Sequence, residues 1–180
     1  MQPSDDEFGF VPEHDRPIPY LQRIRDYYLT LGYGTPYRWA QYADVPFQAL
    51  TKSLKDSTVA LITTAAPYQP DKGDQGPGAR YNSSAKFYKV YSGDTSADHD
   101  VRISHVGYDR IHTTAEDMNT WFPLPAMRRL QAKGRFGRIA RHFHGAPTNR
   151  SHRTTLDVDC PEILMRCRAD AVDAAILVAN

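Results

Sequence analysis

The residues best suited to chemistry gather in one short segment, RHFHGAPTNRSHR at 141–153. His142 and His144 are separated by a single residue, so on a strand their side chains point to the same face. Two imidazoles on one face can ligate a metal ion, and a third ligand could come from His152 or Asp157. Metal binding is therefore one hypothesis for this segment, and structural hydrogen bonding by the same histidines is another.

Carboxylate recognition is a further hypothesis for this segment, and we favour it over metal binding. Arg153, with Asn149 and His152 nearby, could bind a substrate carboxylate, because a guanidinium group pairs with a carboxylate through two parallel hydrogen bonds. Arg80 ends a glycine-containing segment, DKGDQGPGAR at 71–80, which lacks the spacing of a nucleotide-binding loop. This segment is expected to be a flexible surface loop, or a backbone anion site to which Arg80 adds charge.

A second group of acid and base residues lies in RISHVGYDRIHTTAEDMNTWFP, residues 102–123. His105 and Asp109 follow a predicted strand, a position at which side chains of an α/β domain face the ligand crevice. An imidazole near a carboxylate can act as a general acid or base, so both are candidate catalytic residues, as is His144. His112 is a weaker candidate, because the threonines that follow it indicate the N-terminus of a helix.

The chain has two cysteines, and the sequence predicts different environments for them. Asp159, Pro161 and Glu162 indicate that a helix begins at Asp159. Cys160 would then lie in the first turn, where the helix dipole favours the thiolate, which makes it a candidate catalytic residue. Cys167 shares the apolar stripe of this helix and is expected to be inert. About 10 Å of helix would separate the two thiols, which is too far for a disulfide bond.

Composition and charge limit the class of protein. The 180 residues are 41% apolar and 24% charged, which is typical of one globular domain. A net charge of +1 provides no field for nucleic acid or an anionic membrane, so neither is an expected partner. The sequence has no apolar run long enough to span a membrane, and its acidic N-terminus does not resemble a signal peptide. We therefore expect a cytoplasmic protein with free thiols.

The elements that must position these residues begin after an N-terminal segment rich in prolines and acids. Residues 1–19 are expected to form an extended arm, and residues 20–180 an α/β domain. The spacing of apolar residues predicts a helix over 20–31, with Gly32 as its left-handed cap. A second amphipathic helix is predicted to start after Asp44.

Strand and helix patterns alternate along the rest of the chain. Predicted strands lie at 57–66, 87–91, 100–108, 137–145 and 174–180, and predicted helices lie at 122–134 and from Asp159 onward. The continuous apolar runs at 57–66 and 174–180 are typical of strands buried on both faces. This alternation predicts an α/β fold with a mostly parallel sheet flanked by helices, a Rossmann-like half that lacks its C-terminal half. Asn180 would lie at the carboxyl end of a parallel strand, where such sheets bind ligands.

Four segments, taken in order, resemble the selenoprotein B family of glycine, sarcosine and betaine reductases and its relative in D-proline reductase. They are VALITTAAPYQPDKGD, RISHVGYD…EDMNTWFPLPAMRRL, GRIARHFHGAPTNRSHRTT and DAAILVAN, and they run from about Val59 to Asn180. In that family a selenocysteine, or a cysteine in its place, follows directly after the strand that corresponds to ILVAN. The resemblance therefore implies a chalcogen nucleophile just after Asn180 and a longer reductase chain, of which these residues are the N-terminal part.

The resemblance also implies the reaction and its participants. A selenolate or thiolate attacks a carbon that bears an amine and cleaves the C–N bond reductively, with a thiol as the reductant. No cofactor is implied within residues 1–180, and a pyruvoyl group on a partner subunit holds the small amine substrate. The expected partners are the C-terminal remainder of the same protein or a second subunit, and residues 1–180 alone would be inactive. The alternative is a non-catalytic subunit or metal-binding module that uses His142, His144 and His152.

Overall fold

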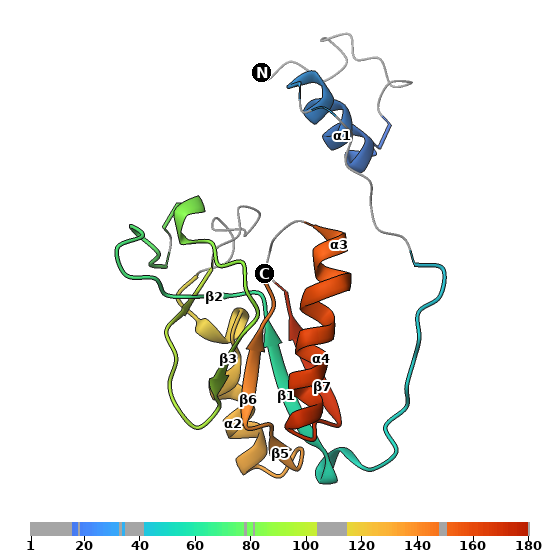
Figure 1. Cartoon of the computed structure of the whole chain (residues 1–180), viewed down its shortest axis with the longest axis vertical. Helices are drawn as coiled ribbons and strands as arrows, with labels where there is room; N and C mark the ends of the chain where they lie inside the picture. The colour runs from blue at the N-terminus through green and yellow to red at the C-terminus, as the bar shows by residue number, and fades with distance from the viewer. Residues whose placement is uncertain are drawn as a thin grey trace, which may run out of the picture. The chain divides into compact units, whose positions relative to one another are not determined.

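The chain forms two compact units, Met1–Val45 and Pro46–Asn180, in a computed structural model (Figure 1). The structure describes residues 16–17, 19–32, 34, 42–77, 79–80, 82–103, 115–147 and 151–179. Most of the expected arm at 1–19 lies outside this description, so its extended form stays a prediction. No helix in the described ranges is long and apolar enough to cross a membrane.

The N-terminal unit contains one described helix, α1, at Tyr20–Thr30. Gly32 follows it with φ +77°, and its N–H donates to the Leu29 carbonyl oxygen at 3.0 Å. A left-handed residue at this position satisfies a carbonyl at the helix end, and glycine adopts it without strain. The predicted first helix and its cap are therefore confirmed.

The second predicted helix, after Asp44, is wrong. Residues 44–53 form no helix, and only one 3₁₀ turn, η3 at Leu54–Asp56, follows them. Phe47, which belongs to the predicted apolar face, is 89% exposed. A short helix depends on packing of its apolar face for most of its stability, and this segment has no such packing within the described residues.

The C-terminal unit is built on a five-stranded mixed sheet, so the predicted α/β class is correct. Its central strand β1, Thr58–Thr63, is almost fully buried, as the sequence predicts. Parallel partners of β1 are β5 at Arg138–Ile139, β6 at His142–Gly145 and β7 at Ala174–Val178, and β3 at Tyr91–Asp94 pairs antiparallel with β6. Val59 pairs with both Ile139 and Ala174, so β5 and β7 lie on opposite sides of β1.

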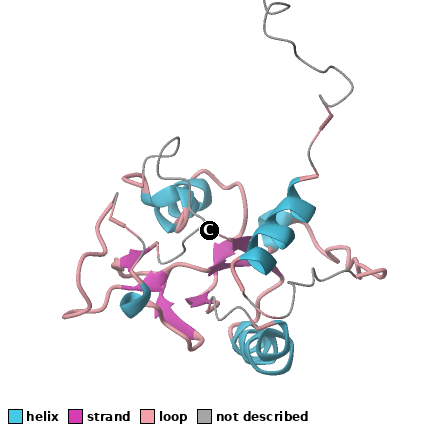
Figure 2. Cartoon of the chain, turned by 90° about the horizontal axis from the view of Figure 1, so that it is seen from above, coloured by secondary structure: helices cyan, strands magenta, loops and turns pink. Residues whose placement is uncertain are grey.

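Helices cover the two faces of this sheet, which Figure 2 views from above. Helix α2, at Leu124–Ala132, packs Leu124 and Met127 into a core that contains Leu61 and Phe143. Helix α4, at Cys160–Ala169, contributes Ile163 and Cys167 to a smaller core around Ala60 on the opposite face. The predicted helix at 122–134 and the predicted strand at 137–145 are thus confirmed, although the strand is divided into β5 and β6.

One predicted strand differs from the structure, and another is described only in part. The strand expected at 87–91 lies instead at β3, 91–94, and runs antiparallel. Of the strand expected at 100–108, residues 104–108 lie outside the described residues. Within the described part, β4 at Val101–Arg102 pairs antiparallel with β2, Ala66–Pro67, in a separate two-stranded sheet. Val101 is the buried residue of β4. Two further 3₁₀ turns in the described residues are η4 at Ser83–Ala85 and η5 at Met118–Thr120, each capped by a preceding side chain.

The last helix begins earlier than the sequence predicts. It starts with α3 at His152–Thr154, continues through one π-helical turn, η6 at Thr155–Asp159, and runs into α4. The cap is Ser151, whose hydroxyl oxygen accepts from the Thr154 N–H at 3.2 Å. Asp159 has helical dihedral angles and is no N-cap. A π-helical turn is a usual site of local distortion in a helix, and here it ends two residues before Pro161, whose ring and missing N–H distort helices.

The terminal strand β7 is not buried on both faces. It is parallel to β1, but it lies at the edge of the described sheet and Leu177 is 65% exposed. Val178 packs against the larger core, while no described element covers Leu177. The apolar sequence of β7 is therefore typical of a strand buried on both faces, but no described element covers one of these faces.

Candidate functional site

The parallel strands β1, β6 and β7 end at one edge of the sheet. The Ala146 N–H, just after β6, donates to the Thr63 carbonyl oxygen at 2.8 Å. The Thr64 N–H, just after β1, donates to the Val178 carbonyl oxygen at 3.1 Å. Ligands of α/β proteins bind outside the carboxyl ends of parallel strands, so this edge is the candidate ligand-binding site.

An apolar groove of about 540 Å³ lies between α4 and β7 and reaches this edge. Thr64, Ala146 and Ala179 line its end at the carboxyl ends of the strands. Cys160 and Leu177 also line it, so an exposed thiol faces a mainly hydrocarbon surface.

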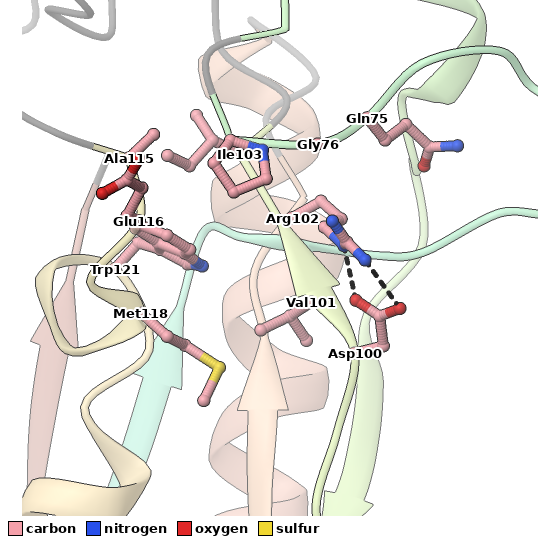
Figure 3. A pocket seen from close by; sticks show the side chains of 11 residues that line it. Gln75, Gly76, Asp100, Val101, Arg102, Ile103, Ala115, Glu116, Met118 and Trp121 are labelled. Atoms are coloured by element: carbon pink, nitrogen blue, oxygen red, sulfur yellow. Dashed lines mark hydrogen bonds and ion pairs between the residues drawn. The ribbon is translucent and has the colours of Figure 1, made fainter.

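A second cavity, of about 170 Å³, lies on the other side of β1, and Figure 3 shows it. Met118 and Trp121 form one wall, and Val101 and Ile103 of the β4 region form the opposite one. The Trp121 carbonyl oxygen accepts from the Thr63 hydroxyl at 2.6 Å, which joins this wall to the end of β1.

Two residues that line the Figure 3 cavity, Asp100 and Arg102, form an ion pair. Arg102 donates from Nε and Nη2 to the two carboxylate oxygens of Asp100, at 2.5 and 2.9 Å (Figure 3). The hydrogen bond to Asp100 raises the pKa of Arg102, and the guanidinium carbon also lies 5.2 Å from the Tyr68 ring centroid. The Arg102 guanidinium thus binds a carboxylate through two hydrogen bonds, and the carboxylate that it binds in this structure is that of Asp100.

Arg102 is a residue that the sequence analysis missed. The signal was available, because the spacing of Asp100 and Arg102 places both side chains on one face of a strand. Arg80, which was predicted to bind substrate, lines a smaller neighbouring cavity together with Arg102 and Asp74. Arg80 and Arg102 therefore line the same small cavity, and Arg102 also lines the cavity of Figure 3.

The loop that carries Arg80 has several internal hydrogen bonds. The Gln75 amide nitrogen donates to the Gln69 carbonyl oxygen at 2.7 Å, and its amide oxygen accepts from the Gln69 N–H at 3.1 Å. Asn82 donates to the Lys72 carbonyl oxygen at 2.5 Å. These contacts hold both ends of the loop against each other, while its function as an anion site stays a prediction.

Four of the predicted site residues lie outside the described residues: His105, Asp109, His112 and Asn149. The residues that flank the segment 104–114, Ile103 and Ala115, are described, and both line the cavity of Figure 3. The roles of the four residues stay predictions.

A polar seam joins β6 to helix α4. The Asp170 carboxylate accepts from the backbone N–H of His142 and contacts its ring Nδ1, both at 2.9 Å. His142 and His144 do point to the same face, as their spacing predicts, and each has its own partner there.

His144 lies deep in this seam, with 1% of its surface exposed. Its Nδ1 is 2.8 Å from the Ser92 hydroxyl, which also accepts from Arg166 Nη1 at 2.6 Å. Which of Nδ1 and the Ser92 hydroxyl donates depends on the imidazole tautomer, and Nε2 is buried with no hydrogen-bond partner among the described residues. Burial lowers the pKa of His144, so the ring is neutral. His144 lines neither the groove nor the cavity of Figure 3, so its catalytic role stays a prediction that its burial does not favour.

The described part of the chain does not contain a set of metal ligands of the kind that the metal hypothesis requires. No group of three or more His, Cys, Asp or Glu side chains is arranged there to hold a metal ion. His142, His144 and His152 all belong to that part. His152 and Arg153 lie exposed in the first turn of the last helix, and their predicted contact with a carboxylate is untested.

The two thiols differ, as predicted for Cys167 but not for the reason predicted for Cys160. Cys160 is exposed in the groove, whereas Cys167 is buried, and burial raises the pKa of the Cys167 thiol. Because the helix begins at His152, Cys160 lies in its interior and not at a free N-terminus. The dipole argument for a reactive Cys160 therefore does not apply, and its candidacy now rests on its exposure in the groove.

Tyr91 is another residue that the sequence analysis missed. Its hydroxyl donates to the Ala65 carbonyl oxygen at 2.7 Å, just after β1, and burial raises its pKa. Its ring occupies the space beside Gly145 at the end of β6. No local pattern predicts this contact, because it joins residues far apart in the sequence.

These features define an α/β protein with parallel strands that end between an apolar groove and an arginine-bearing cavity. Residues 24–180 match the family described as Glycine/sarcosine/betaine reductase selenoprotein B (GRDB), and the chain belongs to this family. The resemblance found in the sequence is thereby confirmed.

Two curated relatives agree with this family. The chain is 33% identical over 133 residues to D-proline reductase subunit gamma of Acetoanaerobium sticklandii, a match that covers 73% of this chain and 52% of the relative. It is 22% identical over 151 residues to the glycine reductase complex component B subunit gamma of Peptoclostridium acidaminophilum, covering 82% of this chain and 33% of the relative. The chain thus spans about half and a third of the lengths of these relatives. No solved structure matches it.

Proposed function

We propose that this chain is the N-terminal portion of a selenocysteine- or cysteine-dependent reductase subunit that cleaves a C–N bond of an amino acid or related amine. Its family membership and the names of its relatives, subunits of D-proline reductase and of a glycine reductase complex, support this proposal. The observation that carries it is the position of β7. This strand lies parallel beside β1 and ends next to Thr64, at the edge shared by the groove and the cavity.

The nucleophile of the proposed reaction is a selenolate or thiolate directly after Asn180. At that point a parallel strand gives way to the next loop or helix, and the N-terminus of a helix stabilises an anion. Ala179 lines the groove, so the following residue would begin beside it. In this proposal the residues after Asn180 complete the sheet as a Rossmann-like domain. The protein acts in the cytoplasm.

The substrate enters as a small amine held by a pyruvoyl group on a partner subunit. The nucleophile attacks the carbon that bears the amine; a C–Se or C–S bond forms as the C–N bond breaks, and the amine leaves with the bonding electrons. One thiol of a dithiol then attacks the selenium or sulfur, so that the carbon leaves and takes up a proton. The second thiol displaces the nucleophile as the dithiol closes to a disulfide. Arg80, Asn149, His152 and Arg153 are the proposed carboxylate-binding residues, to which the structure adds Arg102 as a candidate. His105 and Asp109 are the proposed acids, and His144 and Cys160 keep their place as further candidates.

Activity of the whole complex tests this proposal. The full coding sequence, including the codons after Asn180, is expressed with its pyruvoyl-bearing partner in a host that inserts selenocysteine. Glycine, sarcosine, betaine and D-proline are then offered with dithiothreitol. We expect reduction of at least one of them, and its loss when the residue after Asn180 is changed to serine, whereas a Cys167→Ala variant stays active. Undiminished activity of the serine variant would refute the proposal.

A further inference from the structure

The groove between α4 and β7 is an apolar surface with no described cover. Its lining includes Cys160, Ile163, Leu164, Ala175, Leu177 and Ala179. Leu177 projects to the same side of the sheet as its pairing partner Ile62, which is the side that α4 covers. An exposed apolar groove of this size on a globular domain marks a surface that binds something, whether a ligand, a membrane or another protein segment.

The path of the chain indicates which segment that is. From β1 the chain passes through α2, on one face, and returns as β5 and β6 on one side of β1. From β6 it passes through α4, on the opposite face, and returns as β7 on the other side of β1. The second crossover uses the opposite face of the sheet and moves in the opposite direction along it. Because both are reversed, the two crossovers have the same handedness.

Parallel crossovers within one sheet are right-handed in about 98% of cases. A further parallel strand beyond β7 would continue in the direction of the second crossover. Its connecting helix must then cover the same face as α4, and the space beside α4 on that face is the groove. The groove and the outer edge of β7, with which no described strand pairs, are therefore the two surfaces that one more helix and strand require.

We infer that the helix that follows Asn180 in the full-length protein packs its apolar stripe into the groove between α4 and β7, and that the next strand pairs with the outer edge of β7. This rests on the proposed function, in which the chain continues past Asn180, and the greater length of both relatives supplies the residues for it. The N-terminus of that helix, and with it the nucleophile, then lies on the α4 side of the sheet, at the end of the groove that Thr64 and Ala146 line.

Two exposed positions provide a matched test in the full-length protein. Leu177 lies in the groove and is 65% exposed here, and Met165 lies on α4 outside the groove lining and is 62% exposed. Leu177→Cys and Met165→Cys variants are treated with a maleimide reagent, and the labelled peptides are followed by mass spectrometry. We expect the cysteine at 177 to react at least tenfold more slowly than the cysteine at 165. Equal rates would overturn the inference.

A photo-crosslinking residue at position 177 identifies the cover. The expected product is a crosslink within the same chain, to residues that follow Asn180. A crosslink to a second copy of the chain or to a partner subunit would overturn the inference. Reductase activity and the residue after Asn180 are determined on the same preparation. An active enzyme with an unprotected position 177 would refute this inference alone, whereas a protected position 177 in a protein without selenocysteine or cysteine after Asn180 would refute the proposed function alone.

Discussion

Tyr91 lies against Gly145 so closely that a Cβ atom on Gly145 would be 1.7 Å from Cε1 of the tyrosine ring. The ring is held there by the hydrogen bond of its hydroxyl to the Ala65 carbonyl oxygen. Because Gly145 is the last residue of β6, this contact fixes the end of β6 relative to the chain that follows β1. A glycine is required at this point for space.

A Gly145→Ala variant tests this packing. The added methyl group forces the Tyr91 ring or the β6 backbone to move, and overpacking of this kind costs about 1–3 kcal/mol of unfolding free energy. Urea denaturation measures the loss. The control is Gly76→Ala, where the nearest atom to a Cβ is Asp74 Oδ1, at 3.3 Å, in a flexible side chain. Equal stability of the two variants would show that the ring is not held in place.

The seam between β6 and α4 gives a second prediction. Asp170 has a side chain that is 12% exposed and accepts two hydrogen bonds from His142, so Asp170→Asn should lower the unfolding free energy by about 1–3 kcal/mol. The matched control is Asp98→Asn, because the Asp98 side chain is 98% exposed in its ion pair with Arg128, and surface pairs contribute little. Urea denaturation compares the two, and the prediction fails if Asp98→Asn is the more damaging change.

The buried neutral His144 predicts a dependence of stability on pH. Burial lowers its pKa, so the unfolded chain takes up a proton at a higher pH than the folded protein does. Stability is therefore lost as the pH falls below about 6.5, the pKa of an unperturbed histidine, by at most about 1.4 kcal/mol per pH unit. Urea denaturation between pH 7.5 and pH 5.5 measures this slope. A His144→Gln variant should have a smaller slope, and an unchanged slope would assign the pH dependence to other groups.

Arg80 gives a prediction about substrate binding in the assembled reductase. If its guanidinium binds the substrate carboxylate, Arg80→Gln removes a charge-assisted bond and raises KM at least about tenfold, with little change in kcat. Steady-state kinetics separate the two constants. Arg135→Gln, at an exposed position away from both cavities, is the control. A fall in kcat at constant KM would remove Arg80 from the binding site.

Much of the fold could be predicted because local signals agree with the final packing. The buried strand β1 and the helix α2 have strong apolar patterns, and Gly134 after α2 has φ +65°, as expected of a helix cap. The start of the last helix could not be predicted, since Asp159 and Pro161 imitate a helix start while Ser151 caps the actual one. A π-helical turn that accommodates a proline has no simple sequence signature.

The candidate site was less accessible to sequence analysis. Arg102 could have been found from its spacing to Asp100, the residue just before β4, because its guanidinium pairs with that carboxylate. The contact of Tyr91 with Gly145 and the burial of His144 could not, because each depends on residues brought together by β3 and β6 pairing. Residue type indicated chemistry at His144, but only the fold shows that the ring is enclosed.

The residue that follows Asn180 in the full-length protein tests the central claim most directly. Tandem mass spectrometry of the purified protein identifies this residue, and elemental analysis counts selenium per chain. We expect one selenium atom per chain at that position, or a cysteine in its place. Any other residue there would contradict a reductase whose nucleophile stands at the end of β7.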